Sequence, residues 1–145
     1  MLSTTAIAQL DAYQDRVHAL VNTARELIRQ PPALAQPGIA KVRWHLLRVL
    51  REYQLFKHGE IFDPLIAANR TDLAVMARRL KTACIAAGEA YQSHTMRWTE
   101  QGALDNWEEY RRAVLAIVEQ VDKHLAAERA AVVTLLSSVS RTRKQ

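Results

Sequence analysis

Apolar side chains recur every three or four residues through most of this chain, which is the period of an α-helix that buries one face. The breaks in the pattern fall where Pro, Gly or Asn occurs, at residues 31–38, 68–70 and 101–102. The predicted helices cover residues 4–30, 39–67, 71–100 and 105–138. Since short connections favour antiparallel neighbours, the pattern predicts an all-α, up-and-down antiparallel four-helix bundle.

The same periodicity predicts which side chains face the core. The first helix presents Ala6, Leu10, Tyr13, Val17, Val21, Ala24 and Leu27. The second presents Leu47, Leu50, Gln54, His58, Ile61 and Leu65. The third presents Leu73, Met76, Leu80, Ala83, Ala87, Tyr91, His94 and Trp98. The fourth presents Trp107, Tyr110, Val114, Ile117, Val121, His124, Glu128, Val132 and Leu135. Polar groups therefore interrupt apolar faces on the second and fourth helices.

Three of these polar residues are expected at neighbouring levels. If the antiparallel helices fold back near residues 69 and 102, His58 matches Leu80, and Leu80 matches His124. Glu128 lies one helical turn from His124 on the same face. His45 and His94 match each other near the opposite end, but His45 lies off the main stripe. The candidate polar site is therefore His58, His124 and Glu128, with Gln54 hydrogen-bonded beside them.

Length and composition narrow the class of protein. The 145 residues are one domain in size (1–145), and 49% hydrophobic residues are ample for one core. Cys84 is the one cysteine and is expected as a small buried side chain. We find neither a leader-like start nor an apolar run long enough to span a membrane, so we expect a cytoplasmic protein without a membrane partner.

The net charge of +5 does not by itself indicate a nucleic-acid partner, because basic and acidic residues are interleaved along the chain. The densest basic segments, residues 78–81 and the tail 139–145, are expected as solvated surface. Phosphate-binding loops, Cys-x-x-Cys pairs and serine nucleophile motifs do not occur. A phosphotransfer histidine at His58-Gly59 is disfavoured because His58 falls on a core stripe. We therefore expect a protein that is not an enzyme.

Residues 56–64 (FKHGEIFDP) and 123–129 (KHLAAER) resemble the second and fourth helices of the hemerythrin-like (HHE cation-binding) family. The fourth-helix pattern is His, then Glu four residues later, then an apolar run, and His124 with Glu128 fits it. In the second helix, alignment on Pro64 puts Gln54 where the family has His and His58 where it has Glu. The resemblance implies a metal site, typically carboxylate-bridged di-iron. The third helix offers Met76 and Leu80 at that level, and neither can replace the family's ligands in such a site.

Alternative interpretations of the polar site stay open. His58, His124 and Glu128 could hold one metal ion, iron or another divalent cation, with open positions. Alternatively, Gln54, His58, His124 and Glu128 hydrogen-bond one another and no cofactor is bound, as in an inherited site that has lost its metal.

The leading functional prediction is a non-catalytic, hemerythrin-like sensor, regulatory or interaction protein. It has an eroded metal site and an unknown protein partner, and is a monomer or homodimer. The alternative is a metal-binding protein of oxygen or iron sensing or storage. Trp44, Trp98 and Trp107 are expected near one end of the bundle, as a partner surface or as aromatic core.

Overall fold

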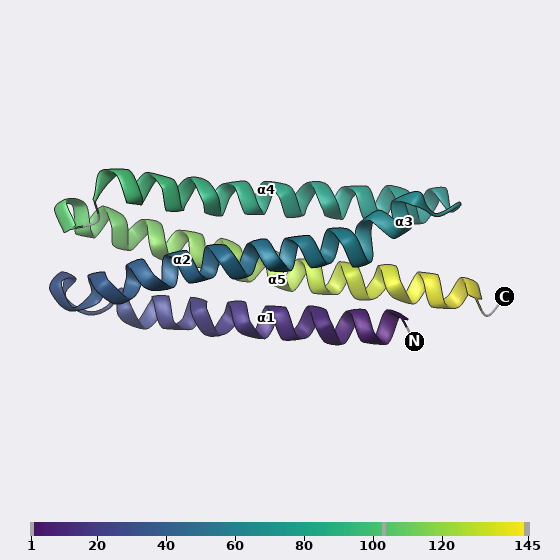
Figure 1. Cartoon of the computed structure of the whole chain (residues 1–145), viewed down its shortest axis with the longest axis horizontal. Helices are drawn as coiled ribbons and strands as arrows, with labels where there is room; N and C mark the ends of the chain where they lie inside the picture. The colour runs from purple at the N-terminus through teal and green to yellow at the C-terminus, as the bar shows by residue number, and fades with distance from the viewer. Residues whose placement is uncertain (1, 103, 144–145) are drawn as a thin grey trace.

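The computed structural model describes residues 2–102 and 104–143, and this part of the chain contains helices and no β-strand (Figure 1). The long helices are α1 (Leu2–Leu27), α2 (Pro32–Lys57), α4 (Thr71–Gln101) and α5 (Trp107–Arg143). A π-helix, η1 (His58–Phe62), and the short α3 (Asp63–Ala67) continue α2, and a 3₁₀ turn, η2 (Leu104–Asn106), precedes α5. The prediction of an all-α chain with four long helices is confirmed.

The long helices lie side by side, and the chain reverses direction between successive ones (Figure 1). α1 packs against α2 and α5, and α4 packs against the same two helices. The helices α2 and α5 are therefore diagonal in the bundle, and their buried residues face each other across its core. Within residues 2–102 and 104–143, no helix combines the length and apolar character that crossing a membrane requires.

Four predicted helix boundaries need correction. The first break is shorter than predicted, because α1 ends at Leu27 and α2 begins at Pro32. Pro32 occupies the first turn, where a missing N–H costs nothing, and Pro37 is accommodated inside the helix. The last helix begins at Trp107 and continues to Arg143, so most of the segment predicted as a basic tail is helical.

The second predicted helix is continuous to Ala67 but changes type at His58. The backbone N–H of Asp63 donates to the carbonyl of His58, five residues earlier. Pro64 follows at once, in the first turn of α3. A proline lacks a donor and crowds the carbonyl four residues earlier, and the wider π-turn gives that carbonyl more room. The turn also changes the register of every side chain beyond Lys57.

The core faces predicted for the first and last helices are largely confirmed. That of the second is wrong by one residue up to His58, and Ile61 beyond it is buried as predicted. The buried side chains of α2 are Ala35, Ile39, Val42, Leu46, Val49, Tyr53 and Lys57. Leu47, Leu50, Gln54 and His58 are partly exposed beside that face. One residue turns a helix by about 100°. The buried polar residue that α2 contributes is therefore Lys57 and not His58.

Candidate functional site

Glu128 on α5 is buried, with 3% of its surface exposed, and both of its carboxylate oxygens have partners. The Lys57 ammonium on α2 donates to Oε1 and Oε2, at 2.8 Å each. The Tyr53 hydroxyl donates to Oε1 at 2.7 Å, and His124 Nε2 lies 3.2 Å from Oε2. Three side chains from two helices thus converge on one carboxylate.

Gln14 on α1 completes this group from a third helix. Its amide nitrogen donates to the Tyr53 hydroxyl at 2.9 Å and to the Leu125 carbonyl at 3.0 Å. The Tyr53 hydroxyl therefore accepts from Gln14 while it donates to Glu128, which uses its hydrogen-bonding capacity on both sides. We call Gln14, Tyr53, Lys57, His124 and Glu128 the central polar cluster.

Helical spacing brings the members of the central polar cluster together. Tyr53 and Lys57 are four residues apart on α2, as are His124 and Glu128 on α5, so each pair lies on one face. The Lys57 ammonium also lies 3.9 Å from the centroid of the Tyr53 ring. A cation over an aromatic ring is attracted electrostatically, more so away from water. Tyr53 therefore helps to hold Lys57 toward Glu128.

Opposing effects act on the protonation of Glu128. Burial favours the neutral acid, but hydrogen bonds from His124 and Lys57 and the positive charge of Lys57 favour the carboxylate, and together they lower its pKa. Burial, followed by the negative charge of Glu128, raises the pKa of the Tyr53 hydroxyl, which therefore stays protonated as a donor. Burial also raises the pKa of the nearby Cys84 thiol. At neutral pH the central polar cluster holds a paired ammonium and carboxylate.

The structure brings together two of the three predicted ligands. His124 and Glu128 are in contact, as predicted from their spacing. Among the described residues, the hydrogen-bonding partners of Glu128 do not include His58 or Gln54. The His58 ring lies against Phe62, with ring centroids 5.8 Å apart, and its Nε2 atom is buried without a hydrogen-bond partner. Desolvation and the charge of Lys81 lower the pKa of His58.

The predicted site did not include Lys57, Tyr53 or Gln14. A lysine is seldom fully buried, and Lys57 was therefore not placed in the core. The available signal was the spacing of Leu46, Val49, Tyr53 and Lys57. These residues form a helical stripe as regular as the predicted stripe of Leu47, Leu50, Gln54 and His58.

The central polar cluster does not have the arrangement of a metal site. A metal ion bound to Glu128 would need the side of the carboxylate that the Lys57 ammonium occupies, 2.8 Å from both oxygens. Across residues 2–102 and 104–143, no three His, Cys, Asp or Glu side chains are grouped so as to hold a metal ion. The Lys57 ammonium therefore supplies the positive charge beside Glu128.

A second buried group, which we call the aromatic cluster, lies near one end of the long helices. Its members are Tyr91, His94, Trp98, Trp107 and Tyr110. The centroid of the Tyr110 ring lies 4.9 Å from that of Trp98, 5.7 Å from that of Trp107 and 6.4 Å from that of His94. His94 and Tyr110 are thus neighbours.

The other residues predicted near this end are on the surface. His45 is exposed on α2, and so is Trp44, with 52% of its surface accessible. Trp98, in contrast, is 2% exposed. The three tryptophans therefore do not form one patch, since Trp98 is core and Trp44 is surface.

Hydrogen bonds from α2 reach the aromatic cluster through Arg43. Its Nη1 atom donates to the Tyr110 hydroxyl at 3.3 Å, and its backbone carbonyl accepts from the Tyr91 hydroxyl at 3.0 Å. Burial, then the positive charges of Arg43 and Arg97, lowers the pKa of His94 to about 4. His94 is therefore neutral at pH 7.

The chain matches no family model, and no curated protein or solved structure matches it either.

Proposed function

We propose that this protein is a non-catalytic, up-and-down antiparallel four-helix bundle of the hemerythrin-like type that acts as a sensor, regulatory or interaction protein. The observation that carries the proposal is the contact of the buried Lys57 ammonium with both oxygens of Glu128. In the metal-binding design, a cation neutralises such a buried carboxylate. Here the lysine supplies the positive charge and hydrogen bonds, so the buried carboxylate does not need a metal.

The protonation of the central polar cluster supports a role without turnover. General acid–base catalysis needs a group whose pKa lies near the working pH and which can reach a substrate. Glu128 has a lowered pKa and its oxygens are already engaged, and Tyr53 has a raised pKa. Both groups hold one protonation state around neutrality, which suits a structural or ligand-contacting role.

The alternative function is metal binding in oxygen or iron sensing or storage. It is favoured by the contact of His124 with Glu128, which has the spacing of a ligand pair. This alternative requires Lys57 to leave Glu128 when metal enters. The two functions therefore differ in what lies beside Glu128 in the working protein.

Metal content separates the two functions. We would measure it by plasma mass spectrometry on untagged protein, and record the visible spectrum after anaerobic ferrous loading and exposure to air. Our proposal expects well below one metal ion per chain and no charge-transfer band. Near-stoichiometric metal that disappears in the double variant His124→Ala, Glu128→Ala would overturn it. The control is His45→Ala, because His45 is an exposed histidine outside the cluster.

A further inference from the structure

A cavity of about 120 Å³ lies between α2, α4 and α5, against the central polar cluster. Tyr53, Lys57 and His124 form part of its lining. The rest of the wall is largely apolar and includes Leu50, Ala87, Ala90, Ile117, Val121 and Leu125. The cavity is thus an apolar space with polar groups along one part of its wall.

The volume limits the ligand to about the size of a single ring. An apolar protein cavity of about 150 Å³ stays dry and binds benzene, so a space of this size suits a molecule of roughly six or seven non-hydrogen atoms. Water would find few hydrogen-bonding partners along the apolar wall. A ring-shaped apolar molecule would contact that wall throughout.

The charge balance of the lining favours an uncharged ligand. Lys57 is the buried cation at the cavity, and Glu128 already neutralises it through two hydrogen bonds. A charged ligand would lose its hydration without gaining a free countercharge, which is unfavourable. Gln54, Gln120 and His124 also line the cavity and can hydrogen-bond a single hydroxyl or carbonyl group.

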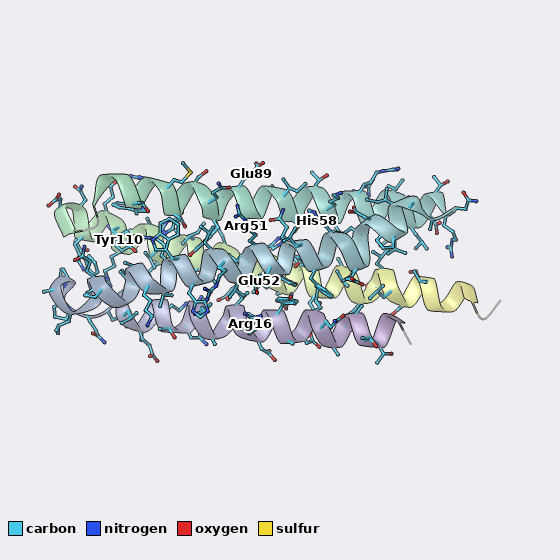
Figure 2. All side chains as sticks on the ribbon, viewed as in Figure 1. Arg16, Arg51, Glu52, His58, Glu89 and Tyr110 are labelled. Carbon is cyan, nitrogen blue, oxygen red and sulfur yellow. The ribbon has the colours of Figure 1, made fainter. Side chains whose placement is uncertain are left out.

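A larger groove, about 330 Å³, runs between α2 and α4 and shares Leu50, Gln54 and Gly88 with the cavity. The end of the Gln54 side chain lies directly over Gly88, where a Cβ atom would be 3.0 Å from Oε1 of Gln54. Arg51 and Glu89 belong to this groove and lie on the two helices that form it (Figure 2). The shared lining places the groove next to the cavity and gives a small molecule a route toward it.

We propose that the cavity is a binding site for a small, uncharged, ring-sized molecule that carries one hydroxyl or carbonyl group. The ring packs between Ala87, Ile117 and Val121, and its polar atom hydrogen-bonds one of the polar side chains of the lining, Gln54, Gln120 or His124. This inference rests on the proposed function, because it gives the chemical class of the ligand that such a sensor would bind.

Phenol is the probe for this site, and benzoate is its charged counterpart of similar shape. We expect phenol to raise the melting temperature of the full chain, with a roughly millimolar or lower Kd, and to shift amide NMR signals at Gln54, Gly88 and Val121. Benzoate at the same concentration should produce neither effect. No response to phenol, or equal binding of benzoate, would overturn the inference.

A matched pair of variants places the phenol. Ala87→Leu fills the cavity and should weaken phenol binding by about tenfold or more. Ala86→Leu makes the same change at the adjacent exposed residue, outside the lining, and should leave binding unchanged. Equal binding by both variants would show that phenol binds elsewhere and would overturn the inference. If Ala87→Leu does not fold, the positions of the shifted NMR signals in the unaltered protein decide the question.

The metal measurement keeps the two proposals distinguishable. Stoichiometric metal together with cavity-dependent phenol binding would remove the proposed function and leave the cavity site. Metal-free protein that does not respond to phenol would leave the proposed function and remove the cavity site.

Discussion

The central polar cluster and the aromatic cluster bury polar groups in different ways. The central polar cluster keeps two charges, on Lys57 and Glu128, and pairs them at 2.8 Å. The aromatic cluster holds His94 neutral among rings. The central polar cluster lies near the middle of the long helices, and the aromatic cluster lies toward one end, where Figure 2 labels Tyr110.

The comparison shows that burial alone does not set the state of a titratable side chain. Glu128 is among the most buried polar residues described, yet its pKa is lowered because two donors offset desolvation. No carboxylate is among the groups that shift the pKa of His94, so desolvation dominates and the pKa falls to about 4. The aromatic cluster is also less completely hydrogen-bonded, since Trp98 Nε1 is buried without a partner.

The largest expected effect comes from removing the buried cation. Lys57→Ala leaves Glu128 as an uncompensated buried charge and should lower the free energy of unfolding by about 3–5 kcal/mol. Urea denaturation followed by circular dichroism measures this loss. The double variant Lys57→Met, Glu128→Leu removes both charges and should recover most of it.

A surface pair provides the control for this experiment. Lys123 lies 3.2 Å from Glu119 on the same helix, and both side chains are mostly exposed. Lys123→Ala should therefore change the free energy of unfolding by no more than about 0.5 kcal/mol. A loss for Lys57→Ala as small as that for Lys123→Ala would contradict the buried ion pair.

The second prediction uses pH to separate the two clusters. The pKa of His94 is about 4 in the folded protein and about 6.5 in the unfolded chain, so between these values only the unfolded chain binds the proton. Stability should therefore fall as pH falls from about 6.5 to about 4, by no more than about 3 kcal/mol from His94. The lowered pKa of Glu128 adds a further loss at more acidic pH.

His94→Phe should remove the share of His94 in the fall of the unfolding free energy between pH 6.5 and 4. It should leave in place the further loss of stability at more acidic pH. His58, whose pKa is also lowered, supplies part of the remaining slope. The exposed residue His45 is the control, and His45→Ala should keep the slope of the unaltered protein. A free energy of unfolding that is constant from pH 7 to pH 4.5 would contradict the prediction.

Sequence periodicity predicted the helices well because it depends on a repeated signal. Four long helices follow from stripes that extend over many residues, and a single misplaced residue does not hide them. The boundaries were less accurate because local chemistry sets them. Pro32 is compatible with a first helical turn, and the break before it was therefore predicted too long.

The prediction of the polar site was right for the contact of His124 with Glu128 on α5 and wrong for the residues that α2 contributes. His124 and Glu128 lie on a stripe bounded by clearly apolar residues, which fixes their orientation. On α2 two adjacent stripes are both apolar enough to face a core, since the helix packs between α1 and α4. Which of the two stripes faces the core depends on a contact between helices, the hydrogen bond of Lys57 to Glu128. The spacing of residues within α2 does not show that contact.

The third prediction compares one hydroxyl in each cluster. Tyr53→Phe removes a hydrogen bond to the charged Glu128 and one from Gln14, and should cost about 1.5–3 kcal/mol. Tyr110→Phe removes only a 3.3 Å bond from Arg43 and should cost about 0.5–1.5 kcal/mol. Thermal and urea unfolding of both variants checks the order. The comparison fails if Tyr110→Phe lowers the free energy of unfolding more than Tyr53→Phe does.

The smallest expected effect concerns Trp44, outside the aromatic cluster on the same helix as Arg43. Because its side chain is 52% exposed, Trp44→Phe should leave the free energy of unfolding within about 0.5 kcal/mol of the unaltered protein. It should also remove much of the fluorescence that iodide quenches, since Trp98 is buried and Trp107 is only partly exposed. Trp98→Phe is the matched change in the core, and it should leave that quenching in place while lowering stability. If Trp98→Phe instead removes the quenchable emission, the core of the aromatic cluster is open to solvent. Desolvation could then not keep His94 neutral, and the contrast with the paired charges of the central polar cluster would lose its physical basis.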